Sequence, residues 1–212
     1  MFNTALVGHS QLPTSLAVEV PVTINIFRSP GAHASNFFEN SQLTSVLENR
    51  YHLIILWIGS NDITDTCQVI DIARNIKEIV VALENTCGAD VRICLIEPRR
   101  PEQQTNIELD NVTYGKIAKA VNRKLQQHFL KGRKFISFGA KPFWEDLKQD
   151  GVHFRRHEKE LFVTSKIKNC ITDAYHKNRS WEALRCPVPV NAKALLENER
   201  EKERRRVESL DK

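Results

Sequence analysis

Ser10, Asp150 and His153 are the residue types that acyl transfer requires, and their places in the chain suit that chemistry. Ser10 directly follows the apolar run 2–7, so the sequence predicts a serine held on a tight turn after a strand. Asp150 and His153 are three residues apart, which allows the carboxylate to orient the imidazole that takes the serine proton. The pattern predicts a Ser-His-Asp catalytic triad.

Acyl transfer also needs hydrogen-bond donors for the negative charge that develops on the carbonyl oxygen. We expect the backbone N–H groups of Ser10 and Gly31 and the side-chain amide of Asn61 to form this oxyanion hole. Gly31 follows the run 20–27 in a Ser-Pro-Gly loop, and Asn61 follows the apolar run 53–58. Loss of one such donor typically lowers the rate by about a hundredfold or more.

Each of these residues taken singly has a simpler explanation. A serine after a strand is usually a turn or cap residue, and a glycine after a proline usually forms a simple turn. Asp62 is a candidate N-cap for the next helix, and His153 alone is compatible with a plain surface position. The functional prediction therefore depends on the order and placement of the residues together.

Two apolar patterns alternate along the chain, short runs typical of strands and three- and four-residue spacing typical of helices. Together they predict the elements that position these residues. The run 53–58 is apolar throughout, which is typical of a strand buried on both faces of a parallel sheet. Residues 69–84 have apolar side chains at three- and four-residue spacing and predict a helix that ends before Gly88. We expect strands at 2–7, 20–27, 53–58, 91–96 and 135–138, and helices near 35–47, 69–84, 112–130 and 158–175.

Strands that alternate with helices predict βαβ units and a parallel sheet covered on both faces. The predicted fold class is α/β, a flavodoxin-like three-layer α/β/α sandwich with about five parallel strands. Ligands of such sheets bind at the carboxyl ends of the strands, so Ser10, Gly31 and Asn61 should share one edge. We expect one domain over residues 1–176, followed over 177–212 by a linker and a charged tail, helical or disordered.

The composition is that of a globular protein. The 212 residues carry a formal net charge of +5, and no apolar run approaches the roughly 18 residues needed to span a membrane. The amino-terminal segment lacks the features of a secretion signal, so we expect a cytoplasmic protein. The five cysteines show no Cys-x-x-Cys pair and are expected to be reduced thiols, and no metal site or cofactor is predicted.

Over about residues 1–175 the motifs resemble the SGNH superfamily of GDSL-type esterases and lipases. The family's four sequence blocks are matched in the correct order by Gly8-His9-Ser10, Gly31, Gly59-Ser60-Asn61-Asp62 and Asp150-Gly151-Val152-His153. The third and last blocks keep the family pattern, and Gly31 is the best match for the glycine of the second block. The resemblance implies a serine esterase that hydrolyses small, acetyl-like acyl esters without a cofactor or metal.

Two features depart from the family pattern. His9 replaces the usual aspartate beside the serine, so the turn at Ser10 needs a different support. The segment between Ser10 and the second predicted strand is short and contains Pro13, so the usual first helix should be short or irregular. A shortened helix would expose more of the site.

A second hypothesis is a catalytically weak or inactive SGNH-fold module, derived from a mobile element, that binds nucleic acid or a protein partner. The stretch Lys116–Lys141 carries eight Lys or Arg side chains, and residues 111–144 contain no Asp or Glu. Such a run could contact phosphates, although a solvated helix face with basic residues towards its C-terminal end is the simpler explanation. The sequence leaves the oligomeric state and the identity of the ester open.

Overall fold

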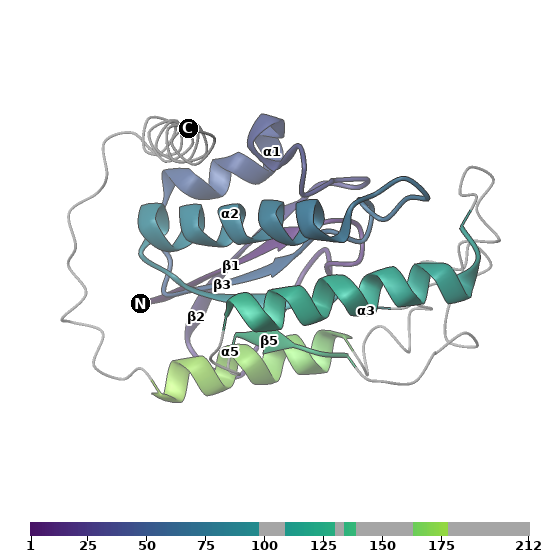
Figure 1. The fold of residues 1–212 in the computed structure, drawn as a ribbon. Helices are drawn as coiled ribbons and strands as arrows, with labels where there is room; N and C mark the ends of the chain where they lie inside the picture. The colour runs from purple at the N-terminus through teal and green to yellow at the C-terminus, as the bar shows by residue number, and fades with distance from the viewer. Residues whose placement is uncertain (98–108, 130–133, 139–162, 178–212) are drawn as a thin grey trace.

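The computed structural model describes residues 1–97, 109–129, 134–138 and 163–177 (Figure 1). The predicted linker and tail lie outside the described residues, apart from Lys177. The part of the predicted last helix before residue 163 lies outside them as well.

A parallel five-stranded sheet forms the centre of the molecule. Its strands are β1 (Phe2–Gly8), β2 (Val22–Arg28), β3 (Leu53–Trp57), β4 (Asp90–Cys94) and β5 (Phe135–Ile136). Their spatial order is β2-β1-β3-β4-β5, and every neighbouring pair is parallel. This is the strand order of flavodoxin-like folds, so the predicted fold class is confirmed.

Helices cover both faces of the sheet (Figure 1). Helices α2 and α3 pack against each other on one face, and α5 covers the other face. The connection from β1 to β2 contains no helix, which confirms the expected irregular first crossover. The helices are η1 (Phe37–Glu39), α1 (Ser41–Thr44), η2 (Ser45–Glu48), α2 (Val69–Cys87), α3 (Asn111–His128) and α5 (Ser165–Lys177).

The central strand β3 is buried along its whole length and divides two hydrophobic cores. Ile54 and Leu56 point into the core beneath α2 and α3. Ile55 and Trp57 point into the core beneath α5. Because successive side chains of a strand alternate between faces, one continuous apolar run supplies both cores. A fully buried aliphatic side chain contributes about 1.5–3 kcal/mol, so β3 is a main source of stability.

Strands β4 and β5 each end two residues before the predicted end, and side chains bind the backbone just beyond them. Strand β4 ends at Cys94, and two residues later Ile96 exchanges two hydrogen bonds with the Asn122 side chain, at 3.0 and 2.9 Å. Strand β5 ends at Ile136, and the N–H of Phe138 donates to the Glu97 carboxylate at 2.9 Å. Side-chain partners thus take over where the ladder stops.

Local signals define the ends of the two long helices. Gly88 ends α2 in the left-handed conformation, with φ of 66°, as the sequence predicts. Asp110 caps α3, since its carboxylate accepts a hydrogen bond from the N–H of Thr113 at 2.8 Å. None of the helices in the described part of the chain is both long enough and apolar enough to cross a membrane.

Replacing Gly8 by alanine should strongly destabilise the fold. A Cβ at Gly8 would lie 1.9 Å from the carbonyl oxygen of Trp57, and Gly8 has a φ of 152°. Because both strands are central, neither backbone can move away, and we expect a loss of more than about 2 kcal/mol. Thermal unfolding followed by circular dichroism measures the effect.

Gly115→Ala is the matched control. A Cβ at Gly115, inside α3, has no neighbour within 4 Å. This substitution should raise stability by about 0.5–1 kcal/mol because alanine favours the helix. Equal effects of the two substitutions would contradict the close approach at Gly8.

Candidate active site

The first block turns sharply where β1 ends, between the ends of its two neighbouring strands. The carbonyl of Gly8 accepts a hydrogen bond from the N–H of Ser29 at 2.9 Å, just beyond β2. The N–H of His9 donates to the carbonyl of Trp57, the last residue of β3, at 3.2 Å. The turn that presents Ser10 is therefore bound on both sides by the sheet.

Ser10 is partly exposed, and its backbone is held by an arginine. Arg28, the last residue of β2, donates to the Ser10 carbonyl from Nε at 3.2 Å and from Nη2 at 2.9 Å. Two bonds from one planar guanidinium restrict both position and orientation. Sequence reasoning did not identify Arg28, because its partner is a backbone atom 18 residues away.

His9 is buried, with 3 % of its surface exposed, and its imidazole contacts polar atoms of Gln11 and Ser60. Its Nδ1 lies 3.3 Å from the backbone N of Gln11, and its Nε2 lies 3.2 Å from Oγ of Ser60. The N–H of Gln11 can only donate, so Nδ1 accepts and the ring proton sits on Nε2. His9 therefore donates to Ser60, which links the first block to the third.

The third block also binds the loop that contains Gly31. The Asn61 side-chain amide donates to the carbonyl of Ala32 at 3.0 Å. The Asp62 carboxylate accepts from the N–H groups of Ala34 and Ser35, at 2.7 and 3.0 Å. Asp62 thus caps this loop instead of the helix that follows it, which corrects the simpler explanation of Asp62 as the N-cap of that helix.

Gly31 itself lies at the surface of this loop. It has a φ of 75°, a left-handed conformation that glycine adopts without strain, and a Cβ there would meet nothing within 4 Å. The turn geometry therefore explains the glycine, and open space lies beside its backbone.

These contacts bring Ser10, Gly31 and Asn61 to the same carboxyl edge of the sheet, in three adjoining loops. The other two residues of the predicted triad, Asp150 and His153, lie outside the described residues, so their places stay a prediction. A partly exposed serine thus shares this edge with the predicted N–H donors, which is compatible with an acyl-transfer site.

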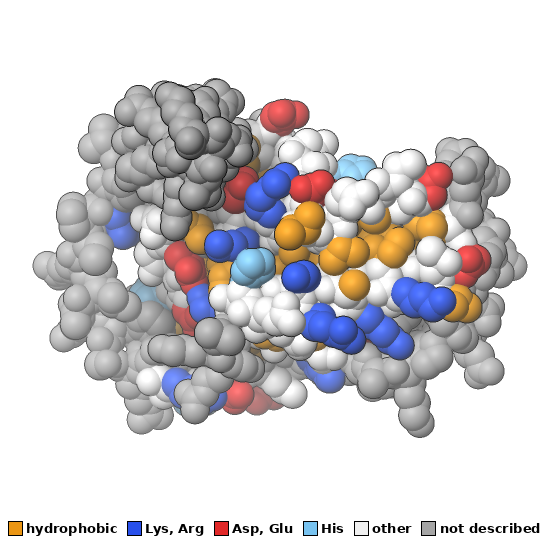
Figure 2. Space-filling view, viewed as in Figure 1, with side chains coloured by type: hydrophobic (Ala, Val, Ile, Leu, Met, Phe, Trp, Pro, Cys, Tyr) orange, Lys and Arg blue, Asp and Glu red, His pale blue; other side chains and the backbone are white. Residues whose placement is uncertain are grey.

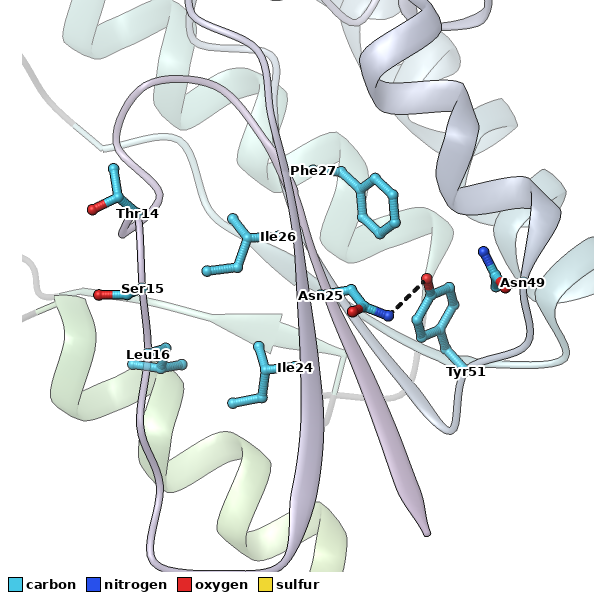
Figure 3. Close-up of a pocket in the computed structure, with 9 residues that line it drawn as sticks. All are labelled: Thr14, Ser15, Leu16, Ile24, Asn25, Ile26, Phe27, Asn49 and Tyr51. Atoms are coloured by element: carbon cyan, nitrogen blue, oxygen red, sulfur yellow. Dashed lines mark hydrogen bonds between the residues drawn. The ribbon is translucent and has the colours of Figure 1, made fainter.

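A pocket of 670 Å³ lies away from these three residues, along the edge strand β2 (Figure 3). One wall is the segment Thr14–Leu16, which runs beside β2, and Tyr51 lies on the other side of the strand. Within this pocket Asn25 donates to the Tyr51 hydroxyl at 3.3 Å. Neither Ser10, Gly31 nor Asn61 lines it, so this hollow is separate from the candidate active site.

Three of the four cysteines in the described part of the chain, Cys87, Cys94 and Cys170, are poor competing nucleophiles. Burial raises the pKa of the Cys87 thiol to about 12 and that of Cys170 to about 11. Cys94 is fully buried, and burial raises its pKa as well. Such thiols stay protonated at neutral pH, and the thiolate is the reactive form. Across the described ranges, no three His, Cys, Asp or Glu side chains form a cluster suited to a metal ion.

Glu97 is a carboxylic acid with an unusual environment just beyond β4. Burial is the main cause that raises its pKa from 4.5 to about 7, against the lowering effects of the Phe138 N–H and of Lys166. The folded protein therefore holds a proton on Glu97 that the unfolded chain releases near pH 4.5. The folding stability that depends on this bound proton is fully present below pH 4.5 and is lost as the pH rises through about 7.

Glu97→Gln should reduce this pH dependence. Glutamine stays neutral and keeps an oxygen for the Phe138 N–H. Between pH 5 and 8, wild type should lose on the order of 2 kcal/mol more stability than the variant. Urea unfolding at several pH values measures this, with the exposed Glu39→Gln as a control that leaves the profile unchanged. Identical profiles for wild type and Glu97→Gln would contradict a raised pKa.

Neither the family models nor the curated proteins compared with this sequence give a match. Solved structures do match. A member of the lipolytic G-D-S-L family from Veillonella parvula is 16% identical, with a TM-score of 0.59 over 81% of this chain and 99% of that one. A carbohydrate esterase of family 3 from Talaromyces cellulolyticus is 14% identical, with a TM-score of 0.60 over 84% and 99%.

An acetyl xylan esterase is 13% identical, with a TM-score of 0.56 over 79% of this chain and 98% of that one. At these identities the likeness concerns the fold. The chain therefore has the α/β fold of the SGNH and GDSL-type hydrolases, as its sequence blocks predict.

Proposed function

We propose that this protein is a serine esterase that hydrolyses small, acetyl-like acyl esters. The observation that carries the proposal is the convergence of three sequence blocks at one edge of an SGNH-type sheet. Hydrogen bonds join the loops of these blocks directly, His9 to Ser60 and Asn61 to Ala32. The small acyl group is suggested by neighbours in structure that are an acetyl xylan esterase and a carbohydrate esterase.

In the proposed reaction the Oγ of Ser10 attacks the ester carbonyl, and His153 takes the hydroxyl proton. Asp150 orients His153 and stabilises its imidazolium. The N–H groups of Ser10 and Gly31 and the amide of Asn61 bind the oxyanion. The intermediate collapses when His153 returns the proton to the leaving alcohol. Water activated through His153 then hydrolyses the acyl-enzyme and restores Ser10.

Ser10→Ala should abolish both turnover of p-nitrophenyl acetate and labelling of the protein by a fluorophosphonate probe. His153→Ala should lower both by about a thousandfold or more, since it removes the base. Ser15→Ala is a matched control, because Ser15 is an exposed serine in the same connection between β1 and β2. Turnover that survives in Ser10→Ala would refute the proposed nucleophile.

A second proposed function, compatible with the first, is nucleic-acid binding by one face of α3. Lys116, Lys119, Arg123 and Lys124 are exposed, and within the described ranges none of them forms an ion pair. Spacings of three and four residues bring Lys116, Lys119 and Arg123 onto one face of the helix. Figure 2 shows Lys and Arg side chains in a row over α3.

This row is a candidate polyanion surface because its cations are not neutralised locally. The opposite face of α3 is apolar and buried, so the helix orientation is set by packing against α2. Lys116 to Lys124 spans about 12 Å of helix, enough to meet more than one phosphate. Lys134, from the same basic stretch, instead pairs with Glu84.

Lys119→Glu/Arg123→Glu should weaken binding of a fluorescein-labelled oligo(dT) strand, measured by fluorescence anisotropy at several salt concentrations. Losing two phosphate contacts should reduce the slope of log K against log salt by about 1.4. Lys168→Glu/Lys177→Glu on α5 changes the net charge equally on the other face of the sheet and should leave the slope unchanged. Equal effects of both variants would show that overall charge, and not this surface, governs binding.

A further inference from the structure

His9 occupies the position where the family pattern has aspartate, and its surroundings indicate a defined role. The side chain is buried and its ring lies 5.3 Å from the ring of Trp57, centroid to centroid. Both ring nitrogens of His9 have protein partners, Gln11 and Ser60.

Ser60 is held from two sides of the molecule. Its hydroxyl accepts the Nε2–H of His9, which comes from the end of β1. Its carbonyl accepts a hydrogen bond from the hydroxyl of Tyr114, a fully buried residue of α3, at 3.3 Å. Hydrogen bonds therefore fix Ser60 both to the first block, through His9, and to helix α3, through Tyr114.

The next residue in the chain is Asn61, the proposed side-chain donor of the oxyanion hole. Its amide also donates to the carbonyl of Ala32, beside Gly31. Two hydrogen bonds and the peptide bond between Ser60 and Asn61 thus connect His9 to the loop of Gly31. Any shift of Ser60 moves the donor that faces the developing charge.

We propose that His9 is a positioning residue. It holds Ser60 in place, and through Ser60 it fixes the position of Asn61 relative to the turn that carries Ser10. This inference rests on the proposed esterase function. His9 acts as a neutral imidazole with the proton on Nε2, and it takes no part in proton transfer to the substrate. Because a displacement of about 1 Å can cost on the order of a hundredfold in rate, a single contact of this kind affects kcat strongly.

Two substitutions separate the contacts of His9. Asparagine can place a carbonyl oxygen near the position of Nδ1 and keep the Gln11 contact, but it is too short to reach Ser60. Glutamine can place an amide N–H near the position of Nε2 and keep the donor to Ser60. His9→Asn should therefore lower kcat for p-nitrophenyl acetate about 10- to 100-fold with KM nearly unchanged, whereas His9→Gln should retain most of kcat.

A double-mutant cycle tests whether His9 acts through Ser60. Ser60→Ala should lower kcat as much as His9→Asn does, and the double variant should be no slower than either single variant. Thermal unfolding of each variant verifies that it is folded. Additive losses, or an unchanged kcat in His9→Asn, would overturn the inference about His9 and leave the esterase proposal intact.

The ring state of His9 can be measured without any activity. Long-range ¹H–¹⁵N NMR of the full-length wild-type chain should show His9 as a neutral ring protonated at Nε2 at pH 7, and Ser60→Ala should shift its Nε2 resonance. A ring protonated at Nδ1, or an imidazolium, would overturn the inference. Absence of Ser10-dependent turnover in wild type would instead refute the esterase proposal, and with it any catalytic effect of His9.

Discussion

The close approach of β1 and β3 at their carboxyl ends is the constraint on which the rest of the site depends. Gly8 pairs with Trp57 in the sheet, and only the absence of a side chain at Gly8 permits this contact. The approach allows the next residue, His9, to bind the Trp57 carbonyl and to reach Ser60 beyond it. Two loops separated by some fifty residues are joined there because two central strands cannot move apart.

Polar side chains that contact backbone groups hold the loops around this point. Arg28 binds the Ser10 carbonyl, Asp62 binds two N–H groups of the neighbouring loop, and Asn122 binds both backbone groups of Ile96. The first two contacts join segments of different βα units, and the third joins the end of β4 to α3, the helix that follows it. Such bonds fix the direction and position of the loop backbone, which a preorganised site requires.

The candidate active site and the basic face of α3 are separate features of the fold. The first lies at the carboxyl edge of the sheet, where the strand ends converge. The second is the solvent side of a helix whose other side is buried against α2. An esterase that also binds nucleic acid would therefore need no shared residues, and each property can be altered by substitutions that spare the other.

The sequence by itself determined the sheet, its order of elements and the blocks at its edge, because these depend on local apolar periodicity and on short motifs. The apolar run of β3, the spacing in α2 and the stop at Gly88 are examples. Only the tertiary structure decided that Arg28 holds Ser10, that His9 donates to Ser60, and that burial raises the pKa of Glu97. It also decided the ends of β4 and β5, where side chains bind the backbone just beyond the strands. These features are contacts and desolvation between residues distant in the chain, and no local pattern encodes them.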